Sequence, residues 1–192
     1  LRDGNSGGNY YPVIQQGAGL VDAQAATAAD SYIKMNKNAS RSYDDGKVKA
    51  ELGDDPERRG VYSFNFTINN LDGQERTYDL SADVFAQDSY EAAARVGDNE
   101  AADYKTYYMD RNTTSLGATT TFSASAVTVP AGGSANVKVT IALDASAKSY
   151  LEERFCNGTY VQAYIFAKPR TTEEGLVGVT HSIPMLAFYG NW

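Results

Sequence analysis

The sequence predicts a mainly β protein, an antiparallel two-sheet sandwich preceded by a short helical segment. Several runs alternate apolar and polar residues, as a strand with one buried face does. These runs are short, and turns rich in Gly, Asn, Asp or Pro separate them, which is the spacing typical of a sandwich. The chain also has 14 tyrosines against 7 phenylalanines and 1 tryptophan, a balance that favours half-exposed strands.

The first 45 residues carry little of this alternation. Residues 1–11 are rich in Gly, Asn and Tyr and are expected to form a loop. From Leu20 to about Met35, apolar residues and alanines follow a helical spacing, and Asp22 near the start suits the helix dipole. The polar stretch that follows places an expected domain boundary after residue 36.

The strongest strand signal lies at residues 62–68. Tyr62, Phe64, Phe66 and Ile68 alternate there with polar residues. After a turn at residues 69–73, residues 77–84 alternate in the same way, so the two runs are expected to pair as a hairpin. Further strands are expected at residues 127–129, 137–143, 160–166 and 181–189.

Two segments interrupt the strand pattern. Residues 144–155 are expected to form one or two helical turns, with Asp144 as the N-cap and Asn157-Gly158 as the stop. Residues 87–113 are acidic and rich in tyrosine, and they are interpreted as a long loop between strands, with room for a short strand or helical turn.

Composition excludes several classes of function. A net charge of −7 leaves no basic surplus for a nucleic-acid backbone, and no apolar run reaches the ~20 residues of a membrane span. Cys156 is the only cysteine, so neither a disulfide within the chain nor a thiolate metal site is expected. Its side chain is expected to be buried beside Phe155.

The sequence offers no complete catalytic triad. The only histidine, His181, lies in an expected strand, and no serine follows the pattern of a strand-to-helix elbow. A hydrogen-bonded structural role is therefore expected for His181, and the chain alone is not expected to hydrolyse peptides. The pairs Asp44-Asp45, Asp54-Asp55 and Glu173-Glu174 lack the loop pattern of a calcium site, so they are interpreted as solvated turn carboxylates, with no metal or cofactor.

One run near the N-terminus carries a family resemblance. Gln16-Gly17-Ala18-Gly19-Leu20-Val21-Asp22-Ala23 leads into an alanine-rich segment. It resembles the closing strand-turn-helix of subtilisin-like serine peptidase domains, which follows the helix that carries the nucleophile. The resemblance implies that residues 1–36 are the end of such a catalytic domain.

A second resemblance covers the β region. The blocks that carry it are Val127–Ile141 with its Val-Pro-Ala-Gly hairpin, Phe155–Val161, Ile183–Trp192 and, more weakly, Lys49–Asp55. They are similar to the fibronectin type III-like domain of bacterial cell-envelope subtilases, a family that includes lactocepin-like proteinases and streptococcal complement-cleaving peptidases. The resemblance implies a fibronectin type III-like β-sandwich over residues 37–192, and residues 87–113 match no block of it.

Together the two resemblances imply a non-catalytic accessory region of a secreted, cell-envelope serine endopeptidase. Its expected partners are the catalytic domain of its own chain, which it would brace, and the protein substrates whose access it would shape. Calcium is left open for the full-length parent. The alternative is a free-standing adhesin or carbohydrate-binding sandwich, which would have no need of the N-terminal block.

Candidate binding residues lie in the acidic segment 87–113. Tyr104, Tyr107 and Tyr108 stand close to Lys105 and Arg111 in a segment expected to be a loop, where binding residues often collect. They would stack on a protein substrate or a glycan. The alternative is that these tyrosines pack over an open edge of the core.

Overall fold

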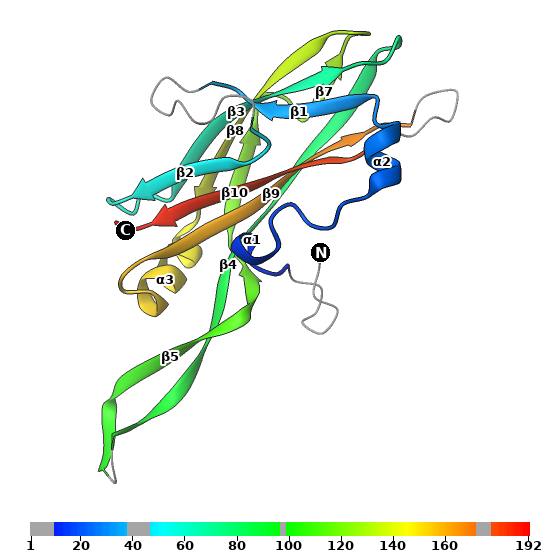
Figure 1. The fold of residues 1–192 in the computed structure, drawn as a ribbon. Coiled ribbons are helices and arrows are strands. Elements are labelled where there is room, and N and C mark those ends of the chain that lie inside the picture. The colour runs from blue at the N-terminus through cyan, green and yellow to red at the C-terminus, as the bar shows by residue number, and fades with distance from the viewer. Residues whose placement is uncertain (1–9, 38–46, 97–98, 172–177) are drawn as a thin grey trace.

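The chain folds as a β-sandwich, which confirms the predicted fold class (Figure 1). The computed structural model of the protein describes residues 10–37, 47–96, 99–171 and 178–192. One sheet has four strands and the other has six, and the apolar faces of both enclose the core. None of the helices in this described part is long and apolar enough to cross a membrane.

The four-stranded sheet is antiparallel throughout. Its order is β1 (Ser31–Met35), β3 (Val61–Asn70), β8 (Ser134–Leu143) and β6 (Ala118–Phe122). Burial alternates along β3, where the side chains of Tyr62, Phe64, Phe66 and Ile68 are buried, as the period of two predicts.

The six-stranded sheet forms the other layer. Its strands are β2 (Ala50–Asp55), β10 (His181–Tyr189), β9 (Thr159–Pro169), β4 (Arg76–Val96) and β5 (Asn99–Ser115), with β7 (Ala126–Val129) also paired to β4. Strands β2 and β10 run parallel, and the other pairs of this sheet are antiparallel.

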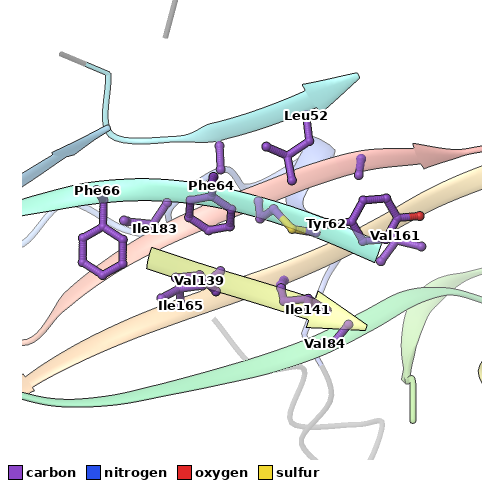
Figure 2. Close-up of a cluster of buried hydrophobic side chains, with 14 of the residues drawn as sticks. Leu52, Tyr62, Phe64, Phe66, Val84, Val139, Ile141, Val161, Ile165 and Ile183 are labelled. Atoms are coloured by element: carbon purple, nitrogen blue, oxygen red, sulfur yellow. The ribbon is translucent and has the colours of Figure 1, made fainter. Parts of the chain in front are cut away.

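Side chains from both sheets meet in one core (Figure 2). Phe66 and Ile141 come from the four-stranded sheet, and Ile165 and Ile183 come from the six-stranded sheet; all four side chains are almost fully buried. Removing such side chains from water contributes about 1.5–3 kcal/mol each, so this core is the main stabilising element of the fold.

The prediction that residues 62–68 and 77–84 pair as a hairpin is wrong. β3 pairs with β1 and β8, whereas β4 lies in the opposite sheet. The chain changes sheets after Asn70, whose buried side-chain amide donates hydrogen bonds to the carbonyls of Gln74, Val129 and Pro130. These bonds satisfy the backbone of a crossing connection, so no tight turn joins the two strands.

The Val-Pro-Ala-Gly turn also joins different sheets. β7 pairs with β4 in the six-stranded sheet, while β8 pairs with β3 and β6 in the four-stranded sheet. The resemblance implied a hairpin here, and the structure corrects it to a second crossing. Gly132, with φ of 60°, supplies the left-handed backbone that this turn requires.

The helices differ from the sequence expectations near the N-terminus. In place of the strand that the resemblance implied before Gly17, residues Val13–Gln16 form one helical turn, α1. The helix expected over Leu20–Met35 is confirmed only as the short α2 (Ala23–Ala28), with Asp22 as its N-cap. Ser31–Met35 is strand β1, because burying Ile33 and Met35 in the core outweighs local helix propensity.

Strand β1 lies before the domain boundary expected after residue 36, yet it is part of the sandwich. Since β1 pairs with β3, the sandwich includes residues 31–35 as well as the later strands. The origin of the residues before β1 in a catalytic domain stays a prediction.

The third helix follows the prediction more closely. α3 (Ala145–Arg154) begins after Asp144, whose carboxylate accepts a hydrogen bond of 2.8 Å from the Ala147 amide. Cys156 follows this helix in the turn before β9 and is exposed, so its expected burial is wrong. The neighbouring Phe155 side chain takes the core position instead.

Candidate functional site

The candidate tyrosines lie on a long β-hairpin, which corrects the loop expected at residues 87–113. Strands β4 and β5 pair in antiparallel fashion and extend beyond the sandwich (Figure 1). The register shifts between Gln87 and Ser89, and beyond this irregularity Tyr90 lies opposite Tyr108 and Glu91 lies opposite Tyr107. Neighbouring residues of a strand point to opposite faces, so Tyr107 and Tyr108 face opposite sides of the hairpin.

Tyr107 faces helix α3. Its hydroxyl donates a hydrogen bond of 2.7 Å to the Glu153 carboxylate, and the Arg154 guanidinium lies 4.9 Å from its ring centroid. These contacts hold Tyr107 against helix α3 of the protein itself. The side chain of Tyr104 lies outside the described residues.

Arg154 ties the base of the hairpin to α3. Its Nη1 donates to the Ser89 carbonyl at 2.9 Å and approaches the Ser89 hydroxyl at 3.3 Å. The guanidinium also lies 5.2 Å from the ring centroid of Tyr150, whose hydroxyl donates to the Asp88 carboxylate at 3.2 Å. Burial is the main cause that raises the pKa of Tyr150, so this phenol stays neutral and remains a donor.

Tyr90 and Tyr108 form a stacked pair on the other side of the hairpin. Their ring centroids are 5.7 Å apart with 22° between the planes, and 55% and 50% of the two residues is exposed. Such a pair presents a broad apolar surface with polar hydroxyl tips, suited to contact with a peptide or a sugar ring. Sequence reasoning missed Tyr90, because its pairing depends on the register shift beside it.

A second region of interest is the contact between the N-terminal segment and the six-stranded sheet. The Tyr10 ring stacks on Phe85 with centroids 5.3 Å apart, and it lies 4.9 Å from the Tyr164 ring. The Tyr10 hydroxyl donates to the Asp83 carboxylate at 2.7 Å. Phe85 and Tyr164 point away from the core, so Tyr10 helps to bury the outer face of this sheet.

Polar groups of strand β9 fix residues 13–17 to the same face. The Val13 amide donates to Gln162 Oε1 at 2.5 Å, and Gln162 is only 1% exposed. The Gln16 side chain donates to the Tyr164 hydroxyl at 2.7 Å, and that hydroxyl donates to the Gly17 carbonyl at 2.6 Å. Burial raises the pKa of Tyr164, so its hydroxyl keeps the proton that this arrangement needs.

Beyond these contacts the segment exposes apolar side chains. Leu20 is 80% exposed, Val21 is 90% exposed, and Ile14 is also exposed. The three belong to the N-terminal segment, which is fixed to the sheet at Val13 and Gly17, and we call these three exposed residues together the N-terminal apolar patch. Exposed apolar patches commonly mark contact surfaces.

His181 lies in strand β10 and is hydrogen-bonded, as the sequence predicted. Its Nε2 is 2.8 Å from the Ser31 hydroxyl, and the Asp30 carboxylate is 3.3 Å from the same hydroxyl. Asp30 thus contacts the serine, whereas the carboxylate of a catalytic triad orients the histidine. Ser31 is also buried, which closes its hydroxyl to a substrate. Burial is the largest cause acting on His181 and lowers the pKa of the imidazole.

The carboxylate pairs were interpreted as turn residues. Asp55 accepts hydrogen bonds from the amides of Arg59 at 3.0 Å and Gly60 at 2.7 Å, which shapes the turn between β2 and β3. The Asp44-Asp45 and Glu173-Glu174 pairs lie outside the described residues. Within residues 10–37, 47–96, 99–171 and 178–192, no cluster of His, Cys, Asp or Glu is arranged to hold a metal ion.

Solved structures with a similar outline share very little sequence with this chain. A PapD-like domain of human CEP192 has a TM-score of 0.46 at 8% identity, over 90% of this chain and 92% of that one. A family 123 glycoside hydrolase from Clostridium perfringens has a TM-score of 0.45 at 7% identity, over 85% of this chain and 28% of that one. The periplasmic chaperone SfaE has a TM-score of 0.39 at 8% identity, over 82% of this chain and 56% of that one. Likenesses this weak carry no argument about function.

Comparison with curated protein sequences finds no relative of this chain. A family match, in contrast, spans most of the sandwich: residues 51–185 match the Fn3-like domain, from strand β2 to strand β10. The two-sheet architecture described above agrees with that match. The chain belongs to the Fn3-like domain family.

Proposed function

We propose that this chain is the non-catalytic accessory region of a secreted, cell-envelope subtilisin-like serine endopeptidase. It braces the catalytic domain and shapes the access of protein substrates. Two observations on sequence support the proposal: Fn3-like domains of this family occur in C-terminal regions of subtilisin-like peptidases, and the Gln16–Ala23 run resembles the end of their catalytic domain.

The observation that carries the proposal is the docking of residues 10–17 on the six-stranded sheet. Tyr10 covers Phe85, the Val13 amide donates a hydrogen bond to Gln162, and Tyr164 donates one to the Gly17 carbonyl, so the chain is held up to Gly17. A segment that ends a catalytic domain and is fixed in this way would hold that domain at a defined position. It would act as a strut rather than as a flexible linker.

The N-terminal apolar patch supplies the contact for the catalytic domain. Leu20 and Val21 are almost fully exposed in this chain, although they lie in the run that resembles a catalytic-domain terminus. In the parent protein the rest of that domain would bury them. Full burial of one such side chain contributes about 1.5–3 kcal/mol.

The hairpin supplies the contact for the substrate. It extends from the sandwich (Figure 1), and the Tyr90–Tyr108 pair is exposed on the side away from α3. The anchor formed by Arg154 and Tyr107 holds its base. A large protein substrate would reach this pair, whereas a short peptide would occupy only the catalytic cleft.

The experiment compares variants of the full-length peptidase. Leu20→Ser combined with Val21→Ser should lower its melting temperature and its activity on a folded protein substrate more than on a short peptide. Val61→Ser is the matched control, because Val61 is also exposed but lies on the other sheet. An unchanged melting temperature in the double variant would contradict the bracing role.

The exposed Tyr90–Tyr108 pair also favours a second candidate function, a free-standing adhesin or carbohydrate-binding sandwich. Here the isolated chain would bind glycans, and the signal would disappear in Tyr108→Ala. A glycan array that stays silent with the wild-type chain would count against this function.

A further inference from the structure

The two outer faces of the sandwich differ in character. The outer face of the six-stranded sheet carries aromatic side chains and is partly covered by residues 10–17. The outer face of the four-stranded sheet is exposed and polar, and we call it the polar face. Its side chains, taken from the outward-facing positions of the strands that are exposed or half-buried, are Tyr32, Lys34, Val61, Ser63, Asn65, Thr67, Thr119, Thr121, Ser134, Asn136, Lys138, Thr140 and Ala142.

Charge on the polar face is opposite to that of the whole chain. The chain has 24 Asp and Glu residues against 17 Lys and Arg, yet the polar face has two lysines and no carboxylate. Neither Lys34 nor Lys138 forms an ion pair with another residue of the described part of the chain. The face is therefore a positively charged area on an acidic protein, and its charge complements an anionic partner.

Hydroxyl and amide groups on this face are ordered in rows across the strands. The hydroxyls of Ser63 and Thr140 are 2.8 Å apart, and Thr67 donates to Asn136 Oδ1 at 2.8 Å. Asn36 also donates to that oxygen, at 3.0 Å. Groups ordered in this way lose little conformational entropy when they bind a ligand.

The dimensions suit a polymer rather than a small ion. Lys34 lies on β1 opposite Thr67, and Lys138 lies two strands away on β8 and two residues further along. Strand spacing and rise then place the two lysines about 12 Å apart. Between them lie Asn65, whose side-chain amide can donate and accept hydrogen bonds, and Thr67, whose hydroxyl donates to Asn136 and can still accept a bond from a ligand.

We propose that the polar face binds an anionic polysaccharide. Lys34 and Lys138 contact its carboxylate or phosphate groups, and the rows of Ser, Thr and Asn side chains bond to sugar hydroxyls. Tyr32, which is 45% exposed at the edge of the face, supplies a ring on which a sugar can stack. The chemistry favours a glycan over an acidic peptide, because hydroxyl-rich rows match hydroxyl-rich ligands.

The test uses the chain as it is, with polygalacturonate and phosphomannan as anionic glycans and dextran as the neutral glycan. Affinity electrophoresis at low ionic strength should show retention by at least one anionic glycan and none by dextran. Lys34→Glu combined with Lys138→Glu should weaken the retention at least tenfold. Lys168→Glu is the matched control, because this exposed lysine lies on the other sheet, and it should leave retention unchanged.

Several results would overturn the proposal. Absence of retention by both anionic glycans would do so, as would a double variant that is retained like the wild type. Equal retention by poly-L-glutamate would show that the polar face binds any polyanion through charge alone, and would contradict specific binding of a glycan. Thermal melting of each variant confirms folding. The proposal is independent of a peptidase parent, since it uses neither the N-terminal apolar patch nor the hairpin.

Discussion

The hydroxyl of Tyr164 donates a 2.6 Å hydrogen bond to the carbonyl of Gly17, which joins the outer face of strand β9 to the glycine turn of the N-terminal segment. These residues are far apart in the sequence, and Gln16 donates to the same hydroxyl. The bond therefore lies where the run that resembles a catalytic-domain terminus meets the Fn3-like sandwich.

Tyr164→Phe should release the N-terminal segment from the sheet. It removes both hydrogen bonds of the hydroxyl and leaves the ring against Tyr10. The expected loss is about 1–3 kcal/mol in the free energy of unfolding, measured by urea denaturation, with faster amide exchange at residues 13–17. Tyr160→Phe, on the same side of β9, is the control and should change neither quantity. Equal exchange rates in both variants would show that the hydroxyl does not hold the segment.

Arg154→Leu should loosen the base of the hairpin. The change removes the bond to the Ser89 carbonyl and the stacking on Tyr107 and Tyr150. Such contacts contribute about 1–3 kcal/mol together, so amide exchange at residues 89–91 should become faster. Ser149→Ala, an exposed change on the same helix, serves as control. Unchanged exchange would show that the strand pairing alone fixes the hairpin.

Stability should fall when the pH is lowered from 7.5 to 5.5. Burial lowers the pKa of His181 in the folded chain, so the unfolded chain, with an ordinary value near 6.5, takes up the proton first. This contribution to stability is present above about pH 6.5 and is lost below it. His181 is the only histidine, so His181→Gln should remove most of the pH dependence in urea unfolding. A variant with the same pH dependence as wild type would contradict this account.

In the full-length peptidase, Tyr108→Ala should lower activity on a protein substrate but not on a short peptide. It removes the stacked partner of Tyr90, and such a pair contributes about 0.5–1.5 kcal/mol. We expect kcat/KM on a protein substrate to fall roughly threefold to tenfold, with the value for a short peptide unchanged. Val48→Ala, an exposed change outside the hairpin, is the control. An equal fall in kcat/KM on both substrates would contradict a role of the hairpin in substrate access.

Local pattern was enough to predict most strands but not their partners. Along β3 every second residue is buried, so the alternation of Tyr62, Phe64, Phe66 and Ile68 predicted the strand and its inner face. The same pattern cannot say which sheet a strand joins. The bonds made by the Asn70 side chain, which connect parts distant in sequence, accompany the crossing that the predicted hairpin missed.

Two elements were missed for a different reason. Ser31–Met35 follows an alanine-rich helix and is short, and only its place beside β3 makes it a strand. The hairpin was interpreted as a loop because it is acidic and because the register shift beside Asp88 interrupts its alternation. The sequence therefore identified the candidate tyrosines. It could not show that Tyr107 contacts α3 while Tyr108 is exposed beside Tyr90, because this depends on the strand register.

We propose above that this chain is the accessory region of a subtilisin-like peptidase. The most direct test is the coding sequence upstream of Leu1, read over several hundred codons. In such a peptidase, these codons encode an Asp block, a His-Gly-Thr block and a Gly-Thr-Ser-Met block, in that order, ahead of Gln16-Gly17-Ala18-Gly19. A signal peptide that leads almost directly into residue 1 would contradict the account and favour a free-standing binding module.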